Sequence, residues 1–403
     1  MLEVRSAGRS AGRLNRTAQQ KFAFTYLADA PAEAAVSLTM PVRPESWLSM
    51  WGIHPIFQMN LPEGALRLHL ATLLAKALPD FDDLELLRVT GWSQIGRLSY
   101  GTPGDSPGEA PRPVSVEEIL TYDGAEDLFR ELLERFAPTS GISGVQPKVL
   151  IRSEEGRKLS PDHKVSLLAP SHVVKTWDAT YPELALNEHF CLLAAAHAGL
   201  AVPIWEVSEN SRFLVVERFD LDDAGNYLGF EDLCVLSGVG TDGKYKGSYE
   251  QIAKTLKDFI EPGAQGQALR DFFKMVALAV GLRNGDAHRK NFGLLYASPI
   301  SRQGVLAPAF DQVTTTAYLP NDVMALTLKG SKKWPNRKSL IGFAVEACGL
   351  APSMAVKALE EVENGILHAR EALREKVQAG DSFSTVGHLM LAAWDQGLAA
   401  LAD

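Results

Sequence analysis

The chain has 403 residues, of which 46% are hydrophobic and 22% are charged, the proportions of an ordinary globular protein. This length is sufficient for two or three domains. The net charge of -9 excludes nucleic-acid binding driven by the field of the whole protein, although it leaves room for a local basic patch.

The cysteines and the apolar segments indicate the compartment. Cys191, Cys234 and Cys348 are far apart in the sequence and odd in number, which argues against a disulfide framework and favours a reducing environment. The first residues lack the apolar segment of a signal peptide, and the apolar run 275–282 is far shorter than the roughly 20 residues that span a bilayer. We therefore expect a cytoplasmic protein without membrane contact.

The N-terminal part mixes short strand-like and helix-like segments. Residues 21–27 alternate like a half-buried strand, and residues 65–78 carry apolar side chains at helical spacing. Residues 101–114 are rich in proline and glycine, which indicates a linker or a long loop. A first domain is therefore expected to cover 1–105.

Strands and helices follow this loop, and helices then predominate. The next predicted elements are a helix at 124–136, strands at 148–152 and 171–176, a helix at 184–198 and a strand at 212–219. From residue 230 onward helices are predicted at 251–259, 269–282 and 352–377. This order indicates an α+β fold with two lobes, the first mixed and the second mainly helical. The second domain is expected at 106–220 and the third at 221–403.

The most informative motif is G-L-R-N-G-D-A-H-R-K-N-F-G-L-L-Y at 281–296. Asp286 and Asn291 are separated by four residues, and Asp311 follows in A-P-A-F-D-Q-V. In a kinase-type site the first Asp orients and deprotonates the acceptor hydroxyl, while the Asn and the second Asp hold Mg2+ against the ATP phosphates. The alternative is an exposed turn followed by an ordinary strand, because this spacing alone is common.

An upstream turn, 139–148, contains Gly141 and Gly144, which permit backbone N–H groups to converge on phosphate oxygens. The alternative is a plain connection between a helix and a strand. Lys175 lies inside an apolar strand, where it either points to water or pairs with ATP phosphates, held by an acidic partner such as Glu188.

The strand end at 215–220 suits a hinge between lobes, where the backbone of Glu217 and Phe219 would bind the edge of adenine, unless it is an ordinary strand end. His288 lacks the spaced histidines of a zinc site, so a nucleotide contact or a loop-structuring hydrogen bond is expected for it. A basic run surrounds Trp334 and comprises Lys329, Lys332, Lys333, Arg337 and Lys338. Such a run is usually a solvated loop, and the alternative is contact with a nucleic acid or an acidic partner.

Together these motifs resemble those of the HipA-like serine/threonine kinases, which are toxins of bacterial toxin–antitoxin pairs. I-S-G-V-Q-P-K at 142–148 is similar to the family's Gly-rich loop, and H-V-V-K at 172–175 to its ATP-lysine strand. The helix motif N-E-H-F-C-L-L at 187–193 and the hinge motif V-E-R-F-D at 216–220 also match.

The resemblance extends to both ends of the chain. G-D-A-H-R-K-N-F at 285–292 and P-A-F-D at 308–311 resemble the family's catalytic and metal motifs. L-P-E-G at 61–64 and I-G-R-L at 95–98 resemble the N-terminal subdomain of its long members. A full-length toxin with a two-lobed kinase fold is therefore expected.

The resemblance implies ATP and Mg2+ as cofactors and a role for each matching residue. Asp286 would be the catalytic base, and Asn291 and Asp311 would bind Mg2+. The implied nucleotide contacts are Ser143, Gly144, Val145, Gln146, Pro147 and Lys148 in the phosphate loop, Lys175 on the phosphates, Glu217, Arg218 and Phe219 on adenine, and His288, Lys290, Asn291 and Asp311 around the phosphates and metal.

The resemblance also implies regulation and partners. Autophosphorylation of a serine in the Gly-rich loop would shut the site, with Ser143 favoured over Ser140. The expected partner is a helix-turn-helix antitoxin like HipB, through which alone the protein would reach DNA. The expected substrate is an aminoacyl-tRNA synthetase, and persistence the expected outcome. Two alternatives are a small-molecule kinase of related fold and a catalytically silent regulator bound to a DNA-binding partner.

Overall fold

The computed structural model describes residues 1–19, 21–50, 52–74, 82–105, 111–124, 127–154, 157–160, 163–165, 171–301 and 303–403. The chain divides into two compact units. The N-terminal unit comprises Met1–Thr176, Ser208–Thr241 and Leu295–Ser301, and the C-terminal unit comprises Trp177–Val207, Asp242–Leu294 and Arg302–Asp403. The predicted α+β class is confirmed, since the first unit holds antiparallel sheets with short helices and the second is mainly helical. The predicted start of the second domain and much of the predicted Pro- and Gly-rich loop, 106–110, lie outside the described residues.

An antiparallel sheet begins the N-terminal unit. Its strands have the order β4-β3-β2-β1-β5, with the bounds β1 Leu2–Ser6, β2 Arg9–Arg16, β3 Phe22–Tyr26, β4 Trp47–Ser49 and β5 Leu98–Gly101. Side chains along β1 alternate between buried and partly exposed, so Leu2 and Val4 face the core. Gly12 of β2 permits close packing, because a Cβ atom there would lie 2.7 Å from the ring of Phe24. The strand predicted at 21–27 is confirmed as β3.

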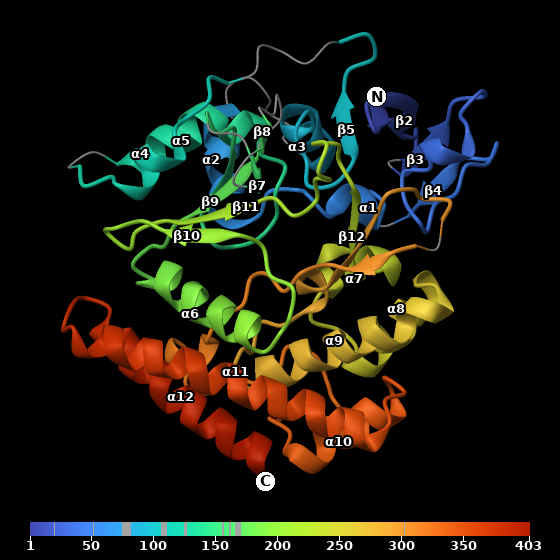
Figure 1. Cartoon of the computed structure of the whole chain (residues 1–403). Coiled ribbons are helices and arrows are strands. Elements are labelled where there is room, and N and C mark those ends of the chain that lie inside the picture. Colours follow the sequence, from blue (N-terminus) through green and yellow to red (C-terminus); the bar gives the residue numbers. More distant parts are fainter. Residues whose placement is uncertain are drawn as a thin grey trace. The chain divides into compact units, whose positions relative to one another are not determined.

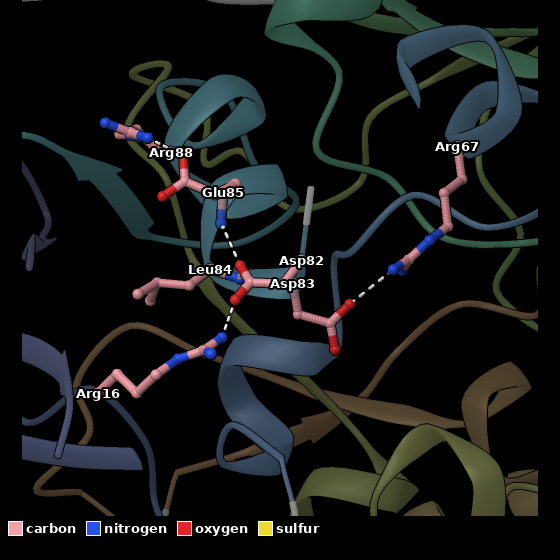
Figure 2. A network of polar contacts seen from close by, with 7 residues as sticks. All are labelled: Arg16, Arg67, Asp82, Asp83, Leu84, Glu85 and Arg88. Carbon is pink, nitrogen blue, oxygen red and sulfur yellow. Dashed lines mark hydrogen bonds and ion pairs between the residues drawn. The ribbon is translucent and has the colours of Figure 1, made fainter. Parts of the chain in front are cut away.

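Short helices accompany this sheet: η1 Ala32–Ala34, α1 Pro55–Gln58, α2 Gly64–Leu74 and α3 Asp83–Thr90. Asp82 caps α3 by accepting hydrogen bonds from two backbone N–H groups of its first turn, each at 2.9 Å, and also pairs with Arg16 of β2 (Figure 2). The next residue, Asp83, pairs with Arg67 of α2 at 2.8 Å. Two adjacent carboxylates thus connect α3 with the sheet and with α2. The helix predicted at 65–78 is confirmed as α2 as far as the described residues extend.

The second sheet contains β6 (Lys148–Ile151), β9 (His172–Lys175) and β11 (Leu214–Glu217), with β9 in the middle and both pairings antiparallel. Helix α5 (Leu128–Phe136) places Leu132 and Phe136 in one core cluster with Val149 and Val174 of the sheet. The predicted strands and the predicted helix before them are confirmed. The other elements of this unit are α4 Val116–Leu120, η2 Ala137–Thr139, β7 Arg157–Ser160, β8 His163–Val165, β12 Gly229–Asp232 and α7 Leu233–Leu236.

Long helices dominate the C-terminal unit. Helix α11 (Pro352–Gln378) packs against α6 (Leu184–His197), α9 (Pro262–Gly281) and α12 (Ser384–Ala402) (Figure 1). A Cβ atom on Gly365 of α11 would lie 2.7 Å from the carbonyl oxygen of Ala194, so glycine permits the close approach to α6. The predicted helices are confirmed, whereas α12 has no counterpart among them. None of the described helices is both long and apolar enough to span a membrane.

The remaining elements are short, and several of them carry the candidate site. They are β10 Trp205–Val207, η3 Thr241–Gly243, α8 Tyr249–Phe259, η4 Arg289–Asn291, β13 Gly293–Tyr296, β14 Val305–Leu306, η5 Thr315–Ala317 and α10 Arg337–Glu346. Strand β13 follows the turn that ends at Asn291.

Candidate active site

The loop that carries Asp286 begins where α9 ends. Arg283 has a left-handed backbone conformation with a φ of 55°, and the N–H of Asn284 returns to a helix carbonyl at 2.8 Å. The side chain of Asn284 then accepts a hydrogen bond from the N–H of Asp286 at 3.0 Å. Gly285 has no room for a side chain, because a Cβ atom would lie 2.6 Å from the carbonyl oxygen of Val323. The chain therefore turns sharply and presents Asp286 directly after the helix.

His288 and Asn291 close the next turn, η4, by reciprocal hydrogen bonds. The N–H of His288 donates to Oδ1 of Asn291 at 3.1 Å, and the N–H of Asn291 donates to the carbonyl of His288 at 3.0 Å. Tyr249 of α8 donates its hydroxyl to the carbonyl of Ala287 at 2.9 Å. Lys290 is buried in the same turn. These bonds orient the amide of Asn291, as a metal ligand requires.

Asp311 lies on a second loop that is joined to the first at both ends. The N–H of Ala307 donates to the carbonyl of Gly293 at 2.9 Å, and the N–H of Gly285 donates to the hydroxyl of Thr315 at 2.8 Å. Asp311 itself has a φ of 51°, which is uncommon for a residue with a Cβ atom and typical of strained functional positions. The C-terminal unit thus brings together the loops that carry the three predicted phosphotransfer residues.

The carboxylate of Asp286 is 49% exposed and has two aromatic neighbours. Tyr245 donates its hydroxyl to Oδ1 of Asp286 at 2.5 Å, and Nε2 of His288 lies 3.9 Å from the same oxygen. The rings of Tyr245 and His288 meet edge to face with centroids 4.9 Å apart. Burial lowers the pKa of His288, and the charges of Lys244 and Lys290 act in the same direction against that of Asp286. His288 is therefore a neutral ring at pH 7.

Tyr245 is a site residue that the sequence motifs do not contain. It lies in G-K-Y-K-G at 243–247 and is 41 residues away from Asp286 in the chain. No spacing rule connects these positions, because the contact depends on how the segment before α8 folds back on the catalytic loop. The available signal is a single aromatic residue between lysines, which fits many exposed loops equally well.

The predicted phosphate loop, 143–148, is anchored at its C-terminal end by hydrogen bonds, and the side chain in its middle is exposed. Gln146 donates to the carbonyl of Thr176 at 3.2 Å, and the N–H of Thr176 donates back to the loop at Pro147 at 2.9 Å. Gly144 has a φ of 122°, which favours glycine, and Val145 is 61% exposed. Ser143 is half-buried beside them.

The N-terminal subdomain contacts this loop through the L-P-E-G segment. Gly64 has a φ of 52°, and a Cβ atom on it would lie 2.6 Å from the carbonyl oxygen of Val145. Glycine therefore lets the two backbones meet. The segment that resembles the family's N-terminal subdomain supports the loop that resembles its Gly-rich loop.

Two of the predicted phosphate-binding lysines lie opposite each other on adjacent strands. Lys148 of β6 is in register with Lys175 of β9, and their exposed fractions are 4% and 5%. Opposite residues of an antiparallel pair project from the same face about 5 Å apart, where like charges destabilise each other. Nζ of Lys148 would lie 2.5 Å from a Cβ atom on Gly144, so its ammonium group reaches the phosphate loop. A phosphate at this position would be attracted by both ammonium groups.

The predicted adenine segment follows β11. Glu217 is the last residue of that strand and is buried. The side chain of Arg218 is fully buried in an ion pair with Asp220 at 2.6 Å and donates to the carbonyl of Gln94 at 2.6 Å. Its backbone N–H is bonded within the same unit, so a nucleotide contact from Arg218 would come from its carbonyl oxygen. Phe219 packs its ring edge-on against another phenylalanine.

The donor set of the C-terminal unit fits Mg2+. Magnesium is usually bound by one or two side-chain oxygens together with substrate phosphates and water, rather than by an all-protein cage. Asn291 and Asp311 supply oxygen donors of this kind. Within the described ranges, no three His, Cys, Asp or Glu residues gather into a metal site of their own.

Comparisons with known proteins cover both parts of the chain. The HipA N-terminal domain matches residues 2–101, and the HipA-like C-terminal domain matches residues 140–369. "Putative kinase Y4mE" of Sinorhizobium fredii (strain NBRC 101917 / NGR234) is 30% identical over 339 residues, which are 79% of this chain and 78% of the relative. Y4dM of the same strain, which carries the same description, is 26% identical over 297 residues, or 70% of this chain and 67% of the relative.

A solved structure has a similar fold. It is a chain of the Shewanella oneidensis MR-1 toxin–antitoxin complex of HipA, HipB and operator DNA, with a TM-score of 0.72 and 19% identity. The similarity covers 100% of this chain and 98% of that chain. Because the HipA-like C-terminal domain alone matches more than half of the sequence, the chain belongs to the HipA family.

Proposed function

We propose that the chain is a serine/threonine protein kinase that uses Mg2+ and ATP and acts as the toxin of a toxin–antitoxin pair. The observation that carries this proposal is the pair of joined loops bearing Asp286, Asn291 and Asp311. Membership of the HipA family and the similarity to a relative described as a kinase support it.

In this proposal the chain contributes mainly position and charge, as phosphoryl transfer requires. Asp286 accepts a hydrogen bond from the acceptor hydroxyl and takes its proton as the oxygen attacks the γ-phosphorus of ATP, whose bond to the bridging oxygen breaks so that ADP leaves. Lys148 and Lys175 bind phosphate oxygens together with the backbone N–H groups of the loop that begins at Ser143. Asn291 and Asp311 would hold Mg2+, which neutralises phosphate charge when bound.

Other predicted residues complete the nucleotide contacts. The backbone of Glu217, Arg218 and Phe219 binds adenine, and His288 and Lys290 lie near the phosphates. The burial of Arg218 in its pair with Asp220 supports a backbone role at this segment. The proposed domains are those expected from the sequence, 1–105, 106–220 and 221–403.

The proposal includes autophosphorylation on Ser143. Ser140 is fully buried, donates its hydroxyl to the carbonyl of Phe136 at 2.8 Å and accepts a hydrogen bond from the N–H of Leu150 at 3.0 Å. Its modification would break both bonds, whereas Ser143 is half-buried in the loop itself. A phosphate on Ser143 adds about -1.5 to -2 charges beside the ATP phosphates and thereby prevents ATP binding.

The proposed partners follow from the family. A HipB-like helix-turn-helix antitoxin binds the toxin and connects it to DNA, as the complex from Shewanella oneidensis MR-1 supports. The proposed substrate is an aminoacyl-tRNA synthetase in the cytoplasm, whose phosphorylation would arrest growth and favour persistence.

The proposal is tested by incubating the purified chain with Mg2+, radiolabelled ATP and cell lysate, followed by mapping of the phosphorylated residues. Wild type should label a synthetase and Ser143, and Asp286→Asn should label both about 10³-fold more slowly. Absence of transfer by wild type would favour a silent regulator, and transfer to small alcohols alone would favour a small-molecule kinase. Phosphate on Ser140 instead of Ser143 would contradict the autophosphorylation assignment.

A further inference from the structure

The carboxylate of the proposed base has a short polar contact with Tyr245. Its hydroxyl donates to Oδ1 of Asp286 at 2.5 Å, a charge-assisted hydrogen bond of the strong class. A carboxylate has roughly four acceptor positions on its two oxygens. Tyr245 therefore occupies one position on one oxygen and leaves Asp286, which is 49% exposed, able to accept from a second hydroxyl.

The segment around Tyr245 is held in place by its backbone. The carbonyl of Lys244 accepts from the N–H of Arg289 at 3.2 Å, and the carbonyl of Lys246 accepts from Nε of the same arginine at 2.8 Å. The carbonyl of Tyr245 accepts from Nζ of Lys332 at 3.3 Å. Three consecutive carbonyls are thus bonded to the catalytic loop and to the basic run, which fixes the hydroxyl relative to Asp286.

The tyrosine ring is fixed as well. It meets the ring of His288 edge to face with centroids 4.9 Å apart, and Nζ of Lys244 lies 5.6 Å from its centroid. Since His288 belongs to the turn that ends at Asn291, the same contact links Tyr245 to both ends of the D-x4-N motif. The backbone hydrogen bonds and the ring contact with His288 together hold the hydroxyl of Tyr245 in one position relative to Asp286.

We infer that Tyr245 is a positioning residue, whose hydroxyl orients the Asp286 carboxylate so that its other oxygen meets the acceptor hydroxyl. This inference rests on the proposed kinase activity. Tyr245→Phe removes one oxygen atom and keeps the ring contact with His288. The chemical step should slow by about 10-fold, because the base is no longer held in its productive rotamer. The KM for ATP should stay unchanged, because the hydroxyl of Tyr245 is bonded to Asp286, which does not bind the nucleotide in the proposed function.

The test is a double-mutant cycle on phosphotransfer, with kcat and the KM for ATP measured for wild type, Tyr245→Phe, Asp286→Asn and the double variant. If Tyr245 acts through Asp286, its substitution has no further effect on the residual rate of Asp286→Asn. Tyr181→Phe is the matched control, because it removes a partly exposed phenol whose ring packs on Tyr318. It should keep the wild-type rate.

Each other outcome overturns the inference. An unchanged kcat in Tyr245→Phe would exclude positioning, and a higher kcat would mean that the phenol blocks the acceptor position. If Tyr245→Phe lowered kcat by the same factor in the wild-type background and in the Asp286→Asn background, the effect would be a general structural one. If wild type transfers no phosphate, the kinase proposal fails and this inference with it, whereas an active wild type with an equally active Tyr245→Phe rejects the inference alone.

Discussion

In the N-terminal unit the charged groups predicted to bind phosphate are buried, whereas in the C-terminal unit the predicted base is exposed. Lys148 and Lys175 are 4% and 5% exposed and take their positions from strand register. The side chain of Asp286 is 49% exposed and takes its position from hydrogen bonds along its loop. Burial strengthens the attraction between an ammonium group and a phosphate, while a base must stay accessible to a second substrate. The two units therefore position charge by different means.

The largest expected effect is that of Asp286→Asn, which removes the base and keeps the shape of the side chain. The rate of phosphotransfer should fall by about 10³-fold, or about 4 kcal/mol, in steady-state kinetics with ATP and a protein acceptor. The KM for ATP should change little, because Asp286 does not bind the nucleotide in our proposal. Asp223→Asn, at an exposed position, is the control and should keep full activity. A variant at Asp286 that keeps about a tenth of the rate or more would argue against a base at this position.

Glu231 is a second kind of buried ionisable group in the N-terminal unit. Its carboxylate accepts hydrogen bonds from Ser37 at 2.7 Å, from the N–H of Leu38 at 2.8 Å and from Tyr296 at 2.6 Å. Burial nevertheless raises its pKa from 4.5 to about 7. The folded state therefore binds this proton more tightly than the unfolded state, so the stability that protonation confers is present below pH 4.5 and is lost as the pH rises towards 7.

Glu231→Gln replaces this group by a neutral one and should flatten the pH dependence. Relative to the variant, the free energy of unfolding of wild type should decrease by up to about 3 kcal/mol between about pH 5 and about pH 8, measured in urea. Glu206→Gln, which changes an exposed carboxyl group, should leave the wild-type profile as it is. Parallel profiles for wild type and Glu231→Gln would show that the carboxylate is charged throughout this range.

The role of the buried lysines of the N-terminal unit can be tested by measuring ATP binding. Lys148→Met and Lys175→Met should each weaken ATP binding by about 30-fold, or about 2 kcal/mol, in calorimetric titrations. Lys254→Met on the exposed face of α8 is the control and should bind ATP as wild type does. An unchanged Kd in both lysine variants would remove this sheet from the proposed nucleotide site.

Features that repeat locally could be predicted from the sequence. The apolar strands around Lys148 and Lys175 and the apolar helix before Asp286 have their expected places, because side-chain periodicity depends on neighbouring residues alone. Strand β1 has no counterpart among the predicted elements, although its side chains alternate; its register with β2 shifts between Val4 and Arg5, which breaks the alternation along β2. Its partner β2 is rich in arginine and small residues that do not resemble a core strand.

The long-range contacts of the candidate site could not be predicted in this way. Tyr245 and Thr315 reach the catalytic loop from positions 41 and 30 residues away from their partners. These contacts depend on how α8 and the loop after β14 fold back on the end of α9, and no local sequence pattern encodes that folding. Motifs therefore predicted the residues proposed to react and missed those that orient them.

Thr315→Val tests how much the orientation of the loop matters, and its expected effect is the smallest. The hydroxyl of Thr315 accepts from the N–H of Gly285 at 2.8 Å and donates to Asp322 at 2.6 Å. Valine keeps the shape and leaves a backbone N–H without its partner, which should destabilise the fold by about 1 kcal/mol and lower kcat by about 5-fold. Thr316→Val is the matched control, because Oγ1 of Thr316 has no hydrogen-bond partner among the residues that the structure describes. Equal kcat values for the two variants would show that the loop keeps Asp286 in place without this bond. Asp286 would then differ from the buried lysines in its exposure and not in how it is anchored.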